Sequence, residues 1–188
     1  MEIVNGVITL FVGGVALLVY WLSKRNEKRN AATIIIMDVR HAESVVTSIL
    51  ERGFVDKDTK DALTENNWEK YKHLFAYDFS QDDFVSFNRF FESCSEMSDA
   101  RNRLKEIFYS GLNTKAVVMQ EKVLSISNPE SAEGKAERDK VISQINNEPC
   151  VFDPSEPRDR IMKSLQLMGR LSNTVAFDKL KCKAGIKA

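Results

Sequence analysis

The sequence predicts a mainly α protein, with a single N-terminal transmembrane helix followed by a helical, bundle-like cytoplasmic domain. Three observations support this prediction. Residues 3–22 form an apolar run that contains no charged residue. The rest of the chain repeats apolar side chains at helical spacing, between residues that are typical of helix starts and ends. Runs that alternate apolar and polar side chains, which mark half-buried strands, are few.

The apolar run from Ile3 to Leu22 has the length of a membrane span. About twenty residues, each rising about 1.5 Å, cover roughly 30 Å, which is the thickness of the hydrocarbon core of a bilayer. Tyr20 and Trp21 lie at its C-terminal edge, where aromatic rings favour the membrane interface. A cleaved signal peptide fits less well, because its basic residues would precede the run. A buried core helix would rarely need so long an apolar stretch.

Basic residues follow the run at once and predict its orientation. The positive-inside rule places the start of the chain outside and everything after Leu22 in the cytoplasm. Tyr20 and Trp21 together with this basic group are the expected interface anchors. The basic group comprises Lys24, Arg25, Lys28 and Arg29.

Within the span, Asn5, Thr9 and Gly13 recur every four residues and therefore share one helix face. Small and polar side chains at this spacing allow membrane helices to approach closely and to form hydrogen bonds. This face is a candidate for helix–helix packing. Ordinary membrane-helix composition, in which Gly is common, is the alternative explanation.

The next segment, residues 23–53, is predicted to be a basic juxtamembrane stretch that continues into a helical stalk. It contains neither Pro nor Gly before Gly53, so the membrane helix can run on unbroken until that glycine ends it. A heptad-like apolar stripe favours packing on helices of the same chain over a coiled coil, because it covers fewer than three heptads. The stripe consists of Ile35, Val39, Ala42, Val46 and Ile49.

Residues 54–128 are predicted to form the helical core of the cytoplasmic part. A short helical turn is expected over Asp58–Leu63. Asn66, followed three residues later by Glu69, has capping-box spacing and predicts a helix over Trp68–Phe79. One face of that helix carries Trp68, Tyr71, either Leu74 or Phe75, and Phe79. These residues are expected to be core, and a binding groove for a partner helix or lipid is the alternative.

Ser80 and Asp83 repeat the capping signal and open the clearest helix of the chain. Phe90 and Phe91 are adjacent on it, so one of them is expected to face a second packing surface, within the chain or on a partner. Gly111 and Asn113 weaken or break this helix. Residues 116–127 then continue it, form a second helix, or, given their β-branched content, form a strand.

Residues 129–188 are predicted to be a C-terminal helical region with a basic tail, separated from the core at Asn128-Pro129. A charge-rich helix over Glu130–Asn146 is followed by a connector with three prolines. Ser155 is expected to cap a final helix whose apolar stripe is Ile161, Leu165, Met168 and Leu171. The lysine-rich end after Thr174 is expected to be solvated.

Composition argues against several function classes. The 27 basic and 27 acidic side chains balance, so the chain lacks the basic excess of a dedicated nucleic-acid binder. The three cysteines, Cys94, Cys150 and Cys182, are odd in number and far apart, which suggests no disulfide framework. No phosphate-binding loop, nucleophile elbow or zinc-protease motif occurs. We therefore predict no catalytic, cofactor-binding or metal-binding residues.

The two histidines, His41 and His73, are the candidate metal ligands. Asp38 precedes His41 by three residues and Glu69 precedes His73 by four, so each pair can share a helix face. The metal sites of helical bundles need Glu-x-x-His twice, with further carboxylates from other helices. Neither pair fits, because one has the wrong acid and the other the wrong spacing.

These observations favour a non-catalytic interaction or scaffold subunit of a membrane-associated assembly. Its expected partners are the lipid bilayer and either itself or another membrane protein. The alternatives are an enzyme or metal-binding helical bundle, and a stress or defence effector that perturbs membranes. The layout resembles that of small bacterial proteins with one N-terminal span of the inner membrane and a helical cytosolic body, and this resemblance alone suggests the inner membrane.

Overall fold

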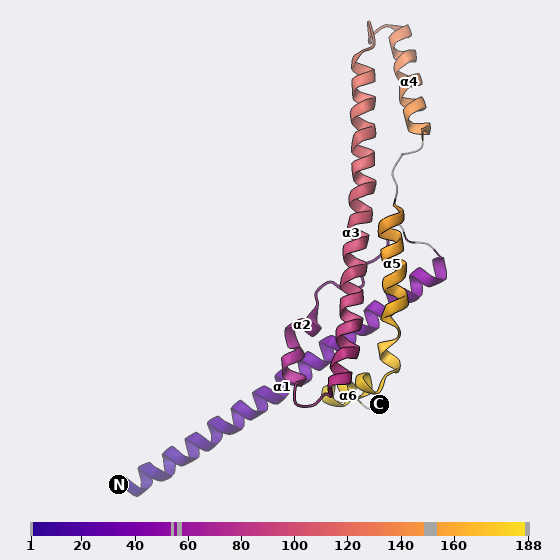
Figure 1. Ribbon diagram of the computed structural model, residues 1–188. Helices are drawn as coiled ribbons and strands as arrows, with labels where there is room; N and C mark the ends of the chain where they lie inside the picture. Colours follow the sequence, from indigo (N-terminus) through magenta and orange to yellow (C-terminus); the bar gives the residue numbers. More distant parts are fainter. Residues whose placement is uncertain (1, 54, 56–57, 149–153, 187–188) are drawn as a thin grey trace.

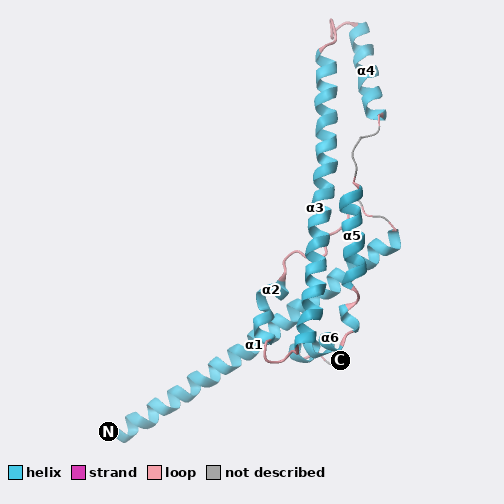
Figure 2. Ribbon diagram, in the orientation of Figure 1, coloured by secondary structure: helices cyan, strands magenta, loops and turns pink. Residues whose placement is uncertain are grey.

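The computed structural model describes residues 2–53, 55, 58–148 and 154–186, with the side chains of residues 2–9 excepted. It is 82% helix, and the described residues contain no strand (Figures 1 and 2). The predicted mainly α class is confirmed. In the part of the chain with described side chains, which begins at Leu10, no helix offers a long enough apolar stretch to cross a membrane. The predicted span also includes residues 3–9, whose side chains lie outside that part.

The first helix, α1 (Glu2–Arg52), is continuous, as the lack of Pro and Gly between the apolar run and Gly53 predicts. Gly53 ends it with φ of 71°, a left-handed conformation that favours glycine, and its N–H donates to the Ile49 carbonyl at 3.0 Å. The N-terminal part of α1 projects alone from the body, whereas its C-terminal part crosses the other helices (Figure 1).

The connector after α1 corrects one prediction. No helix forms over residues 58–63, which are irregular after a turn at Asp58. The backbone carbonyls of this stretch are instead engaged by side chains from distant helices: Arg101 donates to the Thr59 carbonyl, and His41 Nε2 lies 3.0 Å from the Asp61 carbonyl. These bonds satisfy carbonyls that a helical turn would otherwise use.

The predicted helix over Trp68–Phe79 is shorter than expected. It is divided into α2 (Asn67–Tyr71) and a 3-10 helix, η1 (Lys72–Phe75). The expected cap is present, because the Asn66 side chain accepts from the Glu69 N–H at 3.1 Å. The short elements place Trp68 in the core, where its ring stacks on Phe87 with centroids 4.5 Å apart and its Nε1 donates to Asn88 Oδ1 at 2.7 Å.

The long helix α3 (Gln81–Leu124) starts at the predicted capping box, in which Ser80 and Asp83 each bind the backbone N–H of the other. It passes through Gly111 and Asn113 without a break, so the second-helix and strand alternatives are wrong. Phe90 and Phe91 are both 1% exposed. Their second packing surface therefore lies within the chain.

Three more helices complete the described fold. Helix α4 (Ala132–Asn147) folds back along the distal half of α3, and α5 (Ser155–Met168) runs along the proximal half (Figure 1). Pro154, rather than Ser155, is the N-cap of α5, and the predicted stripe of α5 is buried. After a 3-10 turn, η2 (Leu171–Asn173), a further helix α6 (Val175–Ala184) packs on α1.

Helix α6 corrects the prediction of a solvated tail. Thr174 caps it by accepting from the Phe177 N–H at 3.3 Å. Phe177 and Leu180 are at most 1% exposed, inside the core that α1, α3 and α5 share. The apolar positions among the lysines therefore bury one face of α6, and the lysines lie around it.

Candidate functional site: the base of the projecting helix

Residues 10–22 of α1 expose apolar side chains on every face. The ten large apolar side chains in this segment are between 42% and 80% exposed. Leu10, Phe11 and Val12 are consecutive, and so are residues 17–22. Because successive residues of a helix point about 100° apart, no single face accounts for them. We call residues 10–22 the apolar segment.

The apolar segment ends where α1 enters the body, and there the helix is fixed by charged and polar contacts. Lys28 forms an ion pair with Asp78, in the loop before α3. The same carboxylate accepts from Lys183 Nζ of α6 at 2.7 Å. Arg29 Nε donates to the Ala184 carbonyl at 3.0 Å, close to the end of α6. Three separate parts of the sequence thus meet at one point of α1.

The carboxyl group of Asp78 stays ionised at this junction. Burial alone would raise its pKa, but hydrogen bonds from Lys183 and Lys28 outweigh burial and hold the pKa below its ordinary value. Asp83 behaves in the same way: burial opposes ionisation, and Lys179 Nζ, at 2.6 Å, together with Ser80, lowers its pKa. Two acids flanking the start of α3 therefore hold two lysines of α6.

The predicted interface anchors have two different fates. The side chains of Tyr20 and Trp21 are 63% and 60% exposed. Lys24 pairs with Glu27 at 2.8 Å, and the Arg25 guanidinium lies 5.7 Å from the centre of the Trp21 ring. These four residues precede Lys28, whose carboxylate partner lies in the body.

Lys28 and Arg29 instead have partners inside the body, so topology alone does not explain the basic group. Sequence reasoning missed those partners, Asp78 and the end of α6. One indication was present: Lys179 and Lys183 are four residues apart on one helix face, and such like charges repel unless each has an acid nearby.

The predicted helix-interaction stripe is occupied within the chain. Ile35, Val39 and Ala42 are fully buried, Ile49 is 4% exposed and Val46 is partly buried. This stripe packs on the chain's own helices, so it offers no open docking face. Of the proposed membrane-helix packing face, the side chains of Asn5 and Thr9 lie outside the described residues. At Gly13, a Cβ atom would meet nothing within 4 Å.

A second exposed apolar surface lies on the arm that α3 and α4 form away from the body (Figure 1). Lys115 Nζ joins the two helices by donating to the carbonyls of Asn146 and Glu148, at 3.1 and 2.9 Å, where α4 ends. Several apolar side chains of α3 remain exposed. We call this set the arm face: Tyr109, Leu112, Val117 and Leu124.

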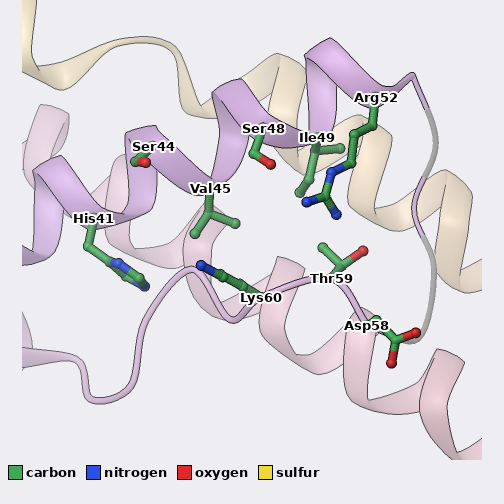
Figure 3. A pocket seen from close by; sticks show the side chains of 9 residues that line it. All are labelled: His41, Ser44, Val45, Ser48, Ile49, Arg52, Asp58, Thr59 and Lys60. Carbon is green, nitrogen blue, oxygen red and sulfur yellow. The ribbon is translucent and has the colours of Figure 1, made fainter.

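A small pocket lies between α1 and the connector, and it is the candidate for small-molecule chemistry (Figure 3). His41, Ser44, Ser48 and Arg52 reach into it from α1, and Thr59 and Lys60 face them from the connector. Its volume of about 220 Å³ is below that of typical ligand pockets, roughly 300–1,000 Å³. His41 Nε2 lies 3.0 Å from the Asp61 carbonyl oxygen, so this ring nitrogen already has a partner within the chain.

The remaining candidates for chemistry are metal-ligating groups and the cysteines. No group of three or more metal-ligating side chains occurs among the described residues. Cys94 is buried, and burial raises the pKa of its thiol to about 12, which removes it as a nucleophile at neutral pH. Cys182 is exposed, and Cys150 lies outside the described residues.

The base of α1 is thus the place where exposed apolar surface, clustered charge and three chain segments coincide. The pocket near His41 is smaller than typical ligand pockets, and neither histidine belongs to a group of metal-ligating side chains among the described residues. Comparison with known proteins yields no match to any family model, curated protein or solved structure.

Proposed function

We propose that the protein is a membrane-tethered, non-catalytic interaction subunit. The apolar segment inserts in the bilayer, the helical body is held at the membrane surface, and the α3–α4 arm reaches a protein partner. The observation that carries the proposal is the exposure of large apolar side chains all round residues 10–22 of a helix that continues into the core.

Lipid suits this surface better than a protein groove. A helix that docks in a groove is apolar along one stripe, whereas a helix that is apolar all round needs an apolar surround. In sequence the apolar character continues back to Ile3, so residues 3–22 together match the thickness of a bilayer core. Tyr20 and Trp21 then lie at the interface.

The distribution of charge supports a cytoplasmic body. Lys24 and Arg25 follow the apolar segment on the projecting part of α1. The positive-inside rule then puts the start of the chain outside. Lys28 and Arg29 add to the same bias, although both also hold the body together.

The arm face is the proposed contact for another membrane-associated protein. Its apolar side chains are exposed, with Leu124 at 76% and Tyr109 at 58%. Copies of this chain can associate in addition through the membrane-helix face that includes Gly13, which has open space in front of it.

Membrane insertion is tested by a matched pair of leucines on α1. Leu10→Arg places a charge near the middle of residues 3–22, which costs about 2.5–3.5 kcal/mol of insertion free energy. Leu50→Arg is the control, because Leu50 is 59% exposed on the same helix but belongs to the body. We expect the wild type and Leu50→Arg to stay in alkali-washed membranes and Leu10→Arg to be released. Equal behaviour of the two variants would refute the tether.

The partner surface is tested by native purification of the tagged full-length protein in mild detergent, with mass spectrometry of the retained proteins. Val117→Glu puts a charge in the arm face, and Thr114→Glu puts the same charge on an exposed polar position one turn away. We expect a companion protein that Val117→Glu loses and Thr114→Glu keeps. Loss in both variants, or in neither, would remove the arm face from the proposal.

A further inference from the structure

A cavity of about 600 Å³ lies at the base of α1, between that helix and the end of α6. Its size falls in the range of ligand sites, roughly 300–1,000 Å³. Residues from both ends of the chain line it: Leu22, Arg25, Asn26, Lys28 and Arg29 from α1, and Cys182, Lys183 and Gly185 from α6 and its cap.

The lining is strongly basic. Four of the lining side chains are Lys or Arg and none is acidic. The carboxylate that neutralises Lys28 also serves Lys183, so two cations share one anion. Arg25 has no ion pair with a described residue, and Arg29 binds a carbonyl rather than an acid. The cavity therefore carries positive charge without matching negative charge.

One feature of the helix end would ordinarily oppose an anion here. The C-terminus of α6 carries partial negative charge on its free carbonyls. Arg29 Nε already engages the Ala184 carbonyl, and the Gly185 N–H donates to the Cys182 carbonyl at 3.1 Å. The engaged carbonyls leave the guanidinium and ammonium groups to determine the potential inside the cavity.

The cavity also has an apolar wall on the side of the apolar segment. Leu22 lines it and is the last residue of that segment, and Arg25 follows one helical turn later. With the apolar segment in a bilayer, the cavity lies at the depth of the lipid phosphates, directly below the hydrocarbon. Basic pockets at this depth are the sites that hold anionic headgroups.

We propose that this cavity binds the phosphate of an anionic phospholipid headgroup. Arg25 and Arg29 present planar guanidinium groups, which suit phosphate oxygens, and Lys183 adds a point charge from the far end of the chain. The proposal rests on the membrane tether, and it adds a requirement that a linear basic run does not have: α6 must be folded against α1. Lipid in the cavity would then join the two ends of the chain.

The native thiol Cys182 lines the cavity and reports its occupancy. The full-length protein, with Cys150→Ser, is reconstituted in nanodiscs of phosphatidylcholine alone or with one-fifth phosphatidylglycerol. The rate of Cys182 alkylation by a neutral maleimide is then measured. Cys94 does not interfere, because it is buried and its pKa is about 12. We expect the anionic lipid to slow alkylation several-fold.

Two matched pairs separate a built site from diffuse attraction. Arg25→Gln and Lys183→Gln each remove a lining charge, and each should raise the phosphatidylglycerol fraction for half-protection about fivefold. Lys24→Gln and Lys181→Gln remove one charge next to these positions but outside the lining. These two control variants should change the phosphatidylglycerol fraction for half-protection less than twofold. Equal effects in both pairs would overturn the site. Arg25→Gln tests the site even if Lys183→Gln loosens α6, since Arg25 has no ion pair with a described residue.

Two further measurements distinguish a lipid headgroup site from a soluble-anion site and from failure of the membrane tether. Inorganic phosphate at millimolar concentration, added to phosphatidylcholine nanodiscs, should give no protection. Full protection by phosphate alone would show a soluble-anion site and overturn the lipid assignment. Failure of the protein to enter phosphatidylcholine nanodiscs would refute the tether itself. Normal entry without protection by the anionic lipid would refute only the headgroup site.

Discussion

The two parts of α1 belong to one unbroken helix, yet their apolar side chains have opposite environments. In residues 31–49 most apolar positions are buried against the chain's own helices, with Ile35 and Val39 fully buried, whereas Ile34 and Met37 are exposed. In residues 10–22 they occur all round, and none of the ten large ones is less than 42% exposed. One backbone conformation therefore serves two surrounds, and side-chain periodicity decides which one each part needs.

The largest expected difference between the two parts is in folding stability. Ile35→Ala should lower the free energy of unfolding of the body by about 2–5 kcal/mol, because it opens a cavity in a closed core. Leu17→Ala should change it by less than about 0.5 kcal/mol, since Leu17 is 72% exposed and has no core contacts to lose. Urea unfolding in detergent, followed by Trp68 fluorescence in a Trp21→Phe background, measures both.

This comparison would fail if the two alanine variants were equally unstable. Such a result would mean that the apolar segment packs against the body in solution. Trp68 is a suitable reporter because its ring lies inside the aromatic cluster, 1% exposed, and its emission should change when the core opens.

The junction between the two parts should show a smaller and pH-dependent effect. Asp78→Asn leaves Lys28 and Lys183 without their shared carboxylate and should cost about 1–2 kcal/mol at pH 7. Asp178→Asn is the matched control, because it removes an exposed pair with Lys181 on the same helix and should cost well under 1 kcal/mol. Urea unfolding of both variants at pH 7 gives the two values.

The sign of the pH dependence follows from the direction of the pKa. The folded protein holds the pKa of Asp78 below its ordinary value of 3.8, so the carboxylate stabilises the fold above that pH. This stabilisation is lost as the pH falls below about 4 and through the lowered folded-state pKa. The wild type should therefore lose stability in this range more steeply than Asp78→Asn. Parallel curves would show that the junction contributes no linkage.

Local sequence patterns predicted the helix starts and ends that are marked by capping residues. Ser80 and Asp83 form the expected capping box, and Gly53 ends α1 in the expected left-handed conformation. The buried stripes of α1 and α5 also followed from helical spacing. In each case the decisive residues lie within a few positions of one another, which is the range that a sequence pattern can report.

Long-range contacts explain what the patterns missed. The helical turn expected over Asp58–Leu63 is absent where Arg101 and His41 approach the carbonyls of Thr59 and Asp61. Gly111 does not end α3, because the distal half of α3 packs on α4 and Lys115 of α3 binds the end of α4. The candidate site also depends on contacts between distant parts of the chain, so local patterns did not predict it.

The sequence pattern predicts a solvated tail for the lysines of α6, because their acids lie about a hundred positions earlier in the chain. Neither Asp78 nor Asp83 stands out locally as a partner for them. The cavity at the base of α1 needs both ends of the chain in contact, and no local pattern reports such a contact.

The smallest expected effect comes from a carboxylate within the buried part of α1. Burial raises the pKa of Asp38, and the hydrogen bond from Asn67 Nδ2, at 3.0 Å, and the nearby His41 offset this only in part. The ionised form is therefore less favourable in the folded than in the unfolded chain. Asp38→Asn keeps an oxygen for Asn67 and removes the charge. It should raise the stability at pH 7 by on the order of a few tenths of a kcal/mol, because water screens this half-buried group.

In the wild type, the sign is opposite to that of Asp78. A raised folded-state pKa means that protonation favours the fold, so stability should rise slightly as the pH falls from neutral through that pKa toward 3.8. It should then fall below about pH 4, as the pH passes through the lowered folded-state pKa values of Asp78 and Asp83 and their stabilisation is lost. Unfolding curves between pH 7 and pH 3 should show this shallow maximum in the wild type and lack the rise in Asp38→Asn. A rise that persists in the variant would assign it to another group. If the rise is absent in Asp38→Asn, the two acids affect the pH dependence of stability with opposite signs. The reason is that Asp78 pairs with two lysines, whereas the hydrogen-bond partner of Asp38 is an amide.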